Sequence, residues 1–306
     1  MKHVFYIISI AAAVLLSFPG VAGEVIEKKK TVSETYQVSA ADKISVTNSF
    51  GQVKLNTWNK KEVKVDITIV GRSASESGAQ ELLDKIKIEH GKNSSGVFFR
   101  TKMEQLHTKN NGNKNKGYKE EGVEINYIVY LPDQNPIDIS NSFGALEIGD
   151  FSGNAVLESK FGSLTAGNLS NVKKLLVEFG KADVKSIHNG ELTIKFSKAN
   201  IEKLSGNIQS NLEFCEAVDI RVDNTLKQFD LKSSYSTVAV VLDKNLSADF
   251  DIKTSFGEMN NSSTFDISEK KQDTKGPVFD RSYHGTAGNG AARVTIKSSF
   301  GNIKLK

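Results

Sequence analysis

The sequence predicts an all-β protein whose main part is a parallel β-helix, a solenoid with coils of about 18–21 residues. Three observations predict this fold. A tag centred on an aromatic residue recurs along the chain, apolar residues alternate with period two before each tag, and a second, shorter alternation follows it. The tag is a small or charged residue, then the aromatic residue, then Gly or another small residue, and its aromatic residues are Phe50, Phe143, Phe161, Phe179, Phe196, Phe214, Tyr235, Phe256 and Phe300.

The spacing of the tags indicates the architecture. From Phe143 to Phe256 successive aromatic residues are 18, 18, 17, 18, 21 and 21 positions apart. Leu175 and Val177 alternate before one tag, and Ala182 and Val184 alternate after it, as expected for two short strands joined by a corner. One coil of this length cannot bury its own apolar face, so we expect the coils to stack about 4.8 Å apart. We expect the solenoid to be right-handed.

The aromatic residues share the parity of the inward aliphatic positions, for example Phe179 after Leu175 and Val177. We therefore expect them to form a buried stack inside the solenoid rather than a platform on which sugars stack. An asparagine also follows six of the tags by about ten residues, and we expect this column to support a repeated turn because Asn tolerates left-handed backbone. These residues are Asn154, Asn171, Asn189, Asn207, Asn224 and Asn245.

The repeat divides the chain into two regions. Residues 24–136 form an N-terminal β region with the first coil and an insertion, and residues 137–306 form the β-helix repeats. Within the insertion, the pattern predicts a helix over 76–89 and a β-hairpin of 96–103 with 123–131.

Two loops are expected to interrupt the repeats. The polar stretch 107–121, rich in Asn, Lys and Gly, is expected to be a flexible exposed loop within the hairpin. Residues 269–292, rich in Lys, Asp and Gly, form a second expected insertion loop before a closing coil at 294–306.

Residues 1–23 predict a secretory signal peptide, with Lys2, an apolar run from 4 to 18 and small residues before the cleavage point. No cysteine follows that point, and no second run of about 18 apolar residues occurs, so we expect neither a lipid anchor nor a membrane anchor. We expect the mature chain in the periplasm, at the cell surface or outside the cell.

The charge balance excludes one class of partner. Of 40 basic residues, removal of Lys2 leaves 39 against 36 acidic residues, a net charge of +3, and the two signs are interspersed. Nucleic acid is therefore not an expected partner. The one cysteine, Cys215, cannot form an internal disulfide, so stability must come from burial.

The repeat resembles the bacterial putative adhesin family, whose members are exported β-helix proteins of unknown molecular function. The resemblance is carried by the Asn-Ser-Phe-Gly tags at 48–51 and 141–144, the segment at 126–132 that leads into the coils, and the final coil at 298–303. It covers nearly all of residues 40–306. It implies the fold and a role in surface attachment, and it supplies no catalytic residues.

No motif for catalysis, a cofactor or a metal stands out. The residues before successive aromatics include Lys160, Glu178, Lys195 and Glu213, which we interpret as a solvated salt-bridge ladder rather than a catalytic carboxylate pair. The histidines lack ligand-like spacing. Cys215 stands where most tags have Gly, as do Ser197 and Ser236, and we interpret it as a small corner residue rather than a nucleophile.

These patterns favour a non-enzymatic, exported binding protein that presents loops and a flat face to an unknown protein or glycan of the envelope or host surface. The residues expected to contact the partner are Lys116, Tyr118, Asp280, Arg281, Tyr283 and His284. One alternative is a polysaccharide-degrading enzyme on the same fold, which would use Glu120 and Glu121 with the last four of these residues. A second alternative is a structural protein of the envelope.

Overall fold

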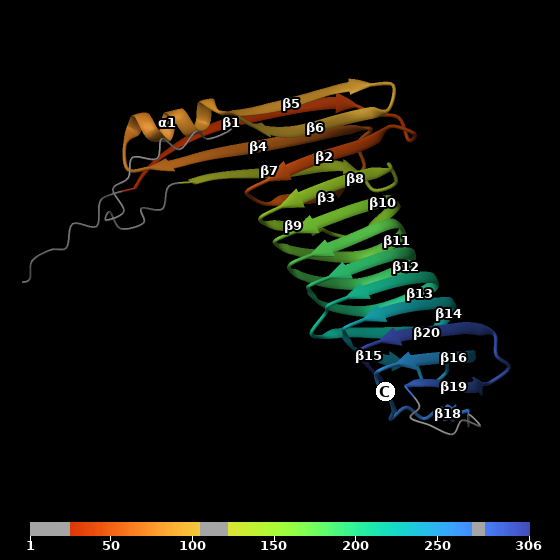
Figure 1. Cartoon of the computed structure of the whole chain (residues 1–306). Helices are drawn as coiled ribbons and strands as arrows, with labels where there is room; N and C mark the ends of the chain where they lie inside the picture. Colours follow the sequence, from red (N-terminus) through yellow and green to blue (C-terminus); the bar gives the residue numbers. More distant parts are fainter. Residues whose placement is uncertain (1–24, 105–121, 271–278) are drawn as a thin grey trace, which may run out of the picture.

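The computed structural model describes residues 25–104, 122–270 and 279–306. These residues are all-β, with α1 (Glu76–Asp84) as their single helix, and their strands form one open sheet (Figure 1). The predicted signal peptide lies outside the described residues. The strands are β1 Ile26–Gln37, β2 Lys43–Ser49, β3 Val53–Trp58, β4 Glu62–Ser73, β5 Ile86–Asn93, β6 Gly96–Met103, β7 Gly122–Pro132, β8 Ile137–Ser142, β9 Ala145–Ile148, β10 Phe151–Lys160, β11 Ser163–Glu178, β12 Lys181–Lys195, β13 Lys198–Glu213, β14 Val218–Ser234, β15 Thr237–Leu242, β16 Ala248–Ser255, β17 Met259–Asn261, β18 Ser268–Glu269, β19 Asp280–Ala287, β20 Ala292–Ser299 and β21 Asn302–Leu305.

Successive repeats lie side by side as parallel strands. Leu164 is opposite Ala182 in one part of the β11–β12 pair, and Leu175 is opposite Leu192 in another part. The strand segments before and after each tag therefore pair separately with the same segments of the next repeat, as the tag spacing predicts. The aliphatic residues of alternate positions are buried, and Val177 is among those with no exposed surface.

The final repeat is not at the end of the stack. We expected the coil at 294–306 to close it, but β20 lies between β14 and β16 and is parallel to both. Val294 is opposite Phe229 on one side and Phe250 on the other. In the same way, β21 lies between β15 and β17. The backbone of β20 can pair along both of its edges. Between β14 and β16 the strand therefore has two hydrogen-bonded neighbours, whereas at the end of the stack it would have one.

The expected insertion loop at 269–292 is partly a strand. β19 (Asp280–Ala287) pairs antiparallel with β16 and covers its outer edge (Figure 1). A short strand, β18, pairs with β19 in turn. Charged residues on a terminal strand discourage pairing with another chain, and Asp280 and Arg281 are exposed on β19.

The expected helix at 76–89 ends early. Its start follows the pattern, because the Ser75 side chain accepts a hydrogen bond from the Gly78 amide at 3.1 Å and caps the helix. It ends at Asp84. Ile86 and Ile88, which we assigned to a helical face, alternate as well with period two and belong to β5.

The expected hairpin of 96–103 with 123–131 is wrong. β6 pairs antiparallel with β5 and parallel with β2, whereas β7 pairs antiparallel with β4 and parallel with β3. Each strand therefore already has two neighbours, and the two together cover the first coil. The stretch 105–121 lies outside the described residues.

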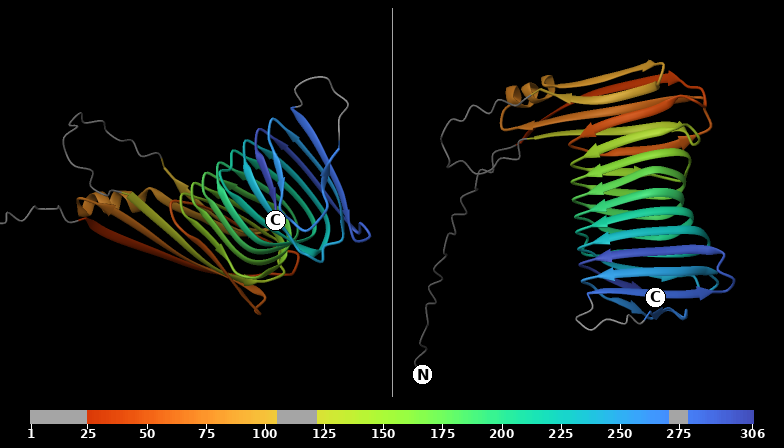
Figure 2. Two further views of the ribbon diagram at one scale, coloured as in Figure 1. Left: turned by 90° about the horizontal axis from the view of Figure 1, so that it is seen from below. Right: turned by 45° about the vertical axis from the view of Figure 1, so that its right-hand side comes forward.

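The N-terminal strands give the molecule a bent outline. β1, β4, β7 and α1, which we call the arm, extend beyond the stacked repeats (Figure 2). The arm projects on the side on which β2, β8 and β10 to β14 end (Figure 1). The aromatic tag residues directly follow the ends of those strands, so the arm overhangs the edge on which they lie.

The asparagine column supports turns in part. Asn189 has a left-handed backbone, with φ of 63°, and its side-chain oxygen accepts a hydrogen bond from the Asn207 amide at 2.9 Å. At the next repeat the left-handed position belongs to Gly206, with φ of 67°. Asn189 is the one member of the column with positive φ among the described residues.

Candidate functional site: an exposed aromatic ladder

The aromatic tag residues are exposed, so the expectation of a buried stack is wrong. Their exposed fractions run from 39% for Phe50 to 53% for Phe256. We call the nine tag residues, together with Phe279, the aromatic ladder.

A backbone reversal at the corner explains this outcome. All nine tag residues have left-handed φ angles, between 49° and 64°. Side chains alternate between the two faces of a strand while the backbone stays extended, and a left-handed residue breaks the alternation. The aromatic ring therefore points outward and the following residue points inward, as the exposed fractions of 4%, 1% and 3% for Ser197, Cys215 and Ser236 show.

The rings form one continuous stack. Neighbouring centroids are 4.8 to 5.2 Å apart along the nine tag residues, and neighbouring planes differ by 1° to 6°. Their order in space is Phe50, Phe143, Phe161, Phe179, Phe196, Phe214, Tyr235, Phe300 and Phe256.

Phe279 adds a tenth ring at the far end. It stacks on Phe256 at 4.9 Å, and its carbonyl accepts a hydrogen bond from the Phe256 amide at 3.0 Å. It is preceded by no tag and lies in no regular repeat, so the sequence carried no signal for its place in the ladder.

Phe is a costly residue for this backbone. A left-handed conformation costs a bulky L-residue about 1–2 kcal/mol, whereas one stacked ring pair contributes about 0.5–1.5 kcal/mol beyond burial. The two effects roughly cancel along the ladder. Gly or Asn would fit the same backbone at lower cost, so backbone stability alone gives no reason for a ring at every corner.

The residue that follows each ring points inward at the corner, and there is little room there for a side chain. A Cβ at Gly162 would lie 2.0 Å from the Gly144 carbonyl oxygen. Where the residue is Ser, its hydroxyl bonds the corner: Ser197 Oγ donates to the Lys195 carbonyl at 2.6 Å and accepts from the Gly180 amide at 3.0 Å. Phe196, the ring before Ser197, has the same left-handed backbone as the other tag residues, with φ of 49°.

Cys215 takes the same corner position, as expected for a small corner residue. Its Sγ donates to the carbonyls of Ile194 and Glu213 at 3.3 and 3.4 Å. Burial raises the pKa of this thiol, which favours its protonated form.

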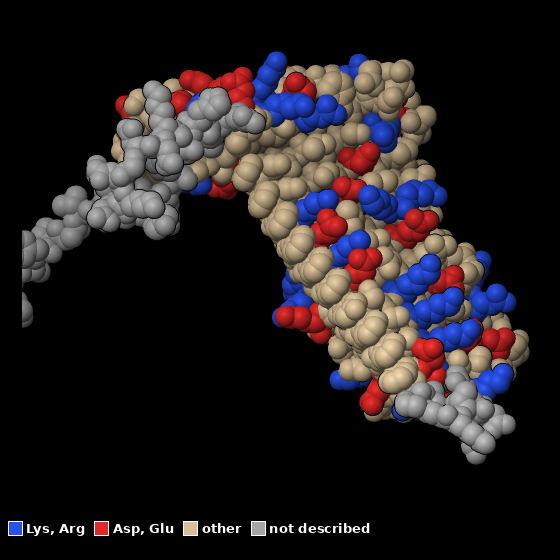
Figure 3. All heavy atoms as spheres, in the orientation of Figure 1, with Lys and Arg blue, Asp and Glu red and all other residues tan. Residues whose placement is uncertain are grey.

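Ion pairs flank the middle of the ladder on both sides. In the row before the rings, Lys160 pairs with Glu178 at 3.0 Å and Lys195 with Glu213 at 3.1 Å. In the row two positions after the rings, Lys198 pairs with Glu216 at 3.2 Å. The predicted salt-bridge ladder agrees with these contacts, and Figure 3 shows an uncharged band along this edge with charged side chains beside it.

None of the carboxylates with a shifted pKa is tuned to act as a general acid. The Lys195 ammonium and the Asn211 amide hold the pKa of Glu213 below its ordinary value. Among the described residues, every carboxylate with a resolved shift has a lowered pKa, whereas a general acid in glycoside hydrolysis needs a raised one. The described residues also contain no cluster of His, Cys, Asp and Glu that could hold a metal ion.

The residues expected to contact a partner are not gathered into one site. Lys116 and Tyr118 lie outside the described residues, as do Glu120 and Glu121. On β19 the side chain of Tyr283 is buried, with 6% exposed, because it faces inward opposite Ile252. We had expected it to be exposed.

The other three residues of β19 each have a nearby partner. Asp280 accepts a hydrogen bond from the Ser255 hydroxyl at 2.5 Å, His284 Nδ1 lies 3.7 Å from Asp251, and Arg281 lies 4.0 Å from Glu269. These contacts are spread along the strand and form no catalytic constellation.

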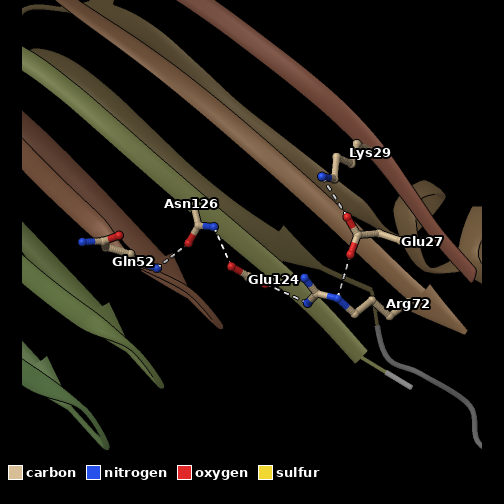
Figure 4. Close-up of polar contacts among 6 residues, drawn as sticks. All are labelled: Glu27, Lys29, Gln52, Arg72, Glu124 and Asn126. Carbon is tan, nitrogen blue, oxygen red and sulfur yellow. Dashed lines mark hydrogen bonds and ion pairs between the residues drawn. The ribbon is translucent and has the colours of Figure 1, made fainter. Parts of the chain in front are cut away.

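A polar network connects the arm to the first corner (Figure 4). Arg72 donates to Glu27 at 3.0 Å and to Glu124 at 2.7 Å. Asn126 donates to Glu124 at 2.7 Å and accepts from the Gln52 amide at 2.8 Å. Gln52 follows the first ring of the ladder by two residues, so this network fixes the arm relative to the ladder.

The chain aligns over most of its length with solved bacterial proteins. A putative cell adhesion protein from Clostridium sporogenes is 16% identical, covering 91% of this chain and 100% of that one, with a TM-score of 0.28. A putative adhesin from Bacteroides fragilis is 12% identical, covering 90% and 97%, with a TM-score of 0.44. A putative lipid binding protein from Parabacteroides distasonis is 12% identical, covering 90% and 96%, with a TM-score of 0.29.

Other solved structures that align with the chain include putative adhesins from Parabacteroides distasonis and Parabacteroides merdae. No family model matches the chain, and no curated protein matches it. In the described ranges, no helix has the length and apolar character needed to cross a membrane.

Proposed function

We propose that this chain is a non-enzymatic, exported binding protein of the adhesin or cell-envelope type, and that the aromatic ladder is its binding surface. The observation that carries the proposal is the exposure of ten stacked rings along one edge. We propose further that the repeats close into the coils of a right-handed parallel β-helix, and the separate parallel pairing of the segments before and after each tag supports this.

The size of the ladder supports a role in binding. Each ring is 39% to 55% exposed, and an aromatic side chain has roughly 150–250 Å² of surface, so the ladder exposes roughly 950 Å². The largest apolar patch on an ordinary monomeric protein covers about 300–600 Å². The left-handed backbone at the nine tag residues adds weight, since such strain gathers at functional sites.

The orientation of the rings favours a protein surface over a glycan. A sugar stacks on the face of an aromatic ring, and here each inner face is covered by the next ring of the ladder. What faces the solvent is a narrow ridge of ring edges. An apolar ridge of this kind fits a complementary apolar surface of an envelope or host protein.

The proposal is tested with protein purified after export and labelled with a fluorophore. We expect it to bind envelope fractions of the producing bacterium or cultured epithelial cells, and the double variant Phe179→Ser/Phe214→Ser to lose that binding. Ile128→Ser is the matched control, because Ile128 is 40% exposed, lies on β7 opposite Lys54 and is not one of the ten rings. Unchanged binding by the double variant would refute the role of the ladder.

The enzymatic alternative has its own test. The purified protein is incubated with a panel of polysaccharides, and new reducing ends and unsaturated products are measured. We expect none. Product formation that disappears on substitution of His284 or Asp280 would replace our proposal with the polysaccharide-degrading enzyme.

A further inference from the structure

We infer that the aromatic ladder binds the ladder of a second copy of this chain, with the two ladders antiparallel and the two-fold axis between Phe196 and Phe214. The inference rests on the proposed function, in which the ladder is a binding surface, and it names a second copy as the partner, so that a second copy and an unrelated host protein would compete for the same surface. Three independent features of the ladder lead to it: its area, the charges on its flanks and the position of the arm.

The area matches that of a stable dimer. Roughly 950 Å² of exposed ring surface on each copy gives roughly 1,900 Å² in total, and stable protein interfaces bury about 1,200–2,000 Å². The ladder is straight and regular, with nearly constant spacing between rings. Such a ridge is self-complementary, as a two-fold interface requires.

The charges on both flanks select the antiparallel arrangement. Rings Phe196 and Phe214 are the fifth and sixth of the ten, and an ion pair flanks them on each side: Lys195 with Glu213, and Lys198 with Glu216. A two-fold axis at this point places each lysine opposite the corresponding glutamate of the other copy. Each flank then has two lysines and two glutamates in alternation, which is an attractive arrangement.

The remaining flanking residues agree with this register. Further from the axis, Glu178 would face Ser234 of the other copy, and Lys181 would face Thr237. No like charges meet in either flanking row. A parallel arrangement in register would instead bring the row before the rings opposite the row after them. It would place Lys195 opposite Lys198, and Glu213 opposite Glu216, and such like-charge contacts disfavour an interface.

The position of the arm also limits how far the two ladders can be shifted along each other. It projects on the side on which the strands that precede the rings end (Figure 1). With ten rings facing ten rings, Phe279 of the other copy lies level with Phe50, and the β18–β19 end of the other copy faces the arm. A register shifted toward the arm would drive the last coil of the other copy into it.

The first experiment measures molar mass by light scattering and sedimentation over a concentration series of the exported protein. The chain has a mass of 33.5 kDa, and we expect twice the mass of the processed chain. Phe196→Ser and Phe214→Ser should each weaken dimerisation about tenfold or more, because central aromatic residues dominate interface energies. Ile128→Ser should leave dimerisation unchanged.

A charge exchange tests the flanks without changing any ring. The variant Lys195→Glu/Lys198→Glu carries only negative charge at the axis, and Glu213→Lys/Glu216→Lys carries only positive charge. We expect each variant alone to be monomeric and a mixture of the two to form a heterodimer. Circular dichroism checks that each variant folds. Both variants have lost their intramolecular ion pairs, so dimerisation of the mixture must come from attraction between the two copies. Failure of the mixture to dimerise would refute the register.

Cysteine crosslinking tests the direction. In the antiparallel dimer Ser142 faces Ser255 of the other copy, so a mixture of Ser142→Cys and Ser255→Cys should form a disulfide-linked heterodimer. Crosslinking in a mixture of Ser142→Cys and Ala145→Cys would indicate the parallel arrangement, in which the row before the rings faces the row after them, and would overturn the inference.

The two proposals can fail separately. If the wild-type protein stays monomeric at all concentrations while Phe179→Ser/Phe214→Ser loses binding to cells or envelope, the dimer is refuted and the binding role of the ladder remains. If the protein dimerises but this variant remains dimeric, the ladder is not the interface.

Discussion

Tyr235 stacks on Phe300 at 4.9 Å and 4° between ring planes, and not on Phe256, the next tag in the sequence. The order of the rings therefore matches the order of the strands in the sheet, where the last residues of the chain lie between two earlier repeats. Phe256 stacks on the other side of Phe300 at 4.9 Å. The C-terminal strands therefore support the repeats on both sides.

The first prediction concerns β20. Ile296 has no exposed surface and faces Leu231 on one side and Ile252 on the other. Ile296→Ala should lower the free energy of unfolding by about 2–5 kcal/mol, as large-to-small core substitutions do. Lys297→Ala, an exposed position on the same strand, should change it by less than about 0.5 kcal/mol. Urea titration measures both, and similar effects would contradict the central place of β20.

The second prediction concerns the backbone of the ladder. Phe179→Gly and Phe179→Ala both remove two stacking contacts, but only Gly relieves the left-handed strain. The Gly variant should therefore be more stable than the Ala variant by about 1 kcal/mol. At an ordinary strand position the order is reversed, so an Ala variant as stable as the Gly variant would show that no strain is stored at the corner.

The third prediction concerns Cys215. A thiol reagent should leave it unmodified in the folded protein at neutral pH and modify it fully in denaturant, because burial raises its pKa. The folded pKa exceeds the unfolded one, so the stability that the neutral thiol preserves is lost as the pH rises above the unfolded value. Cys215→Ser should flatten this alkaline loss while keeping the fold, since Ser already stands at the same corner in Ser197 and Ser236. Rapid modification of the native protein would contradict this assignment.

The fourth prediction concerns the ion pair of Lys195 and Glu213. The pKa of Glu213 is lowered in the folded state, so its contribution is present above the unfolded pKa and lost as the pH falls through the folded one. Both side chains are 30% exposed, and we expect Glu213→Gln to cost less than about 1 kcal/mol at neutral pH. High salt should reduce the difference between variant and wild type. A larger, salt-independent loss would indicate a role beyond a solvated pair.

The sequence predicted what period-two alternation and spacing determine. Leu175, Val177 and Leu192 are buried where alternation places them, and the parallel register between repeats follows the tag spacing. The sequence did not predict the position of the last strands in the sheet, because several neighbouring strands were equally suitable partners. β20 has the same alternation as the repeats beside it, and nothing in residues 292–299 distinguishes a terminal strand from an inserted one.

The rings were misplaced for a different reason. Parity holds only while the backbone remains extended, and one left-handed residue such as Phe161 reverses it. The glycine or small residue after each ring was a usable signal. It marked the position where a side chain has no room, which is the inner side of the corner, and so implied that the ring lies outside.

The insertion of β20 and β21 also constrains the time course of folding. During synthesis, β14 and β15 have an unsatisfied parallel edge until about the last fifteen residues arrive, and such edges recruit other chains. A copy that loses its C-terminus to proteolysis would keep that edge permanently. We expect aggregation to respond far more to cleavage near residue 290 than to cleavage near residue 25, since the N-terminal end removes no neighbour from the repeats.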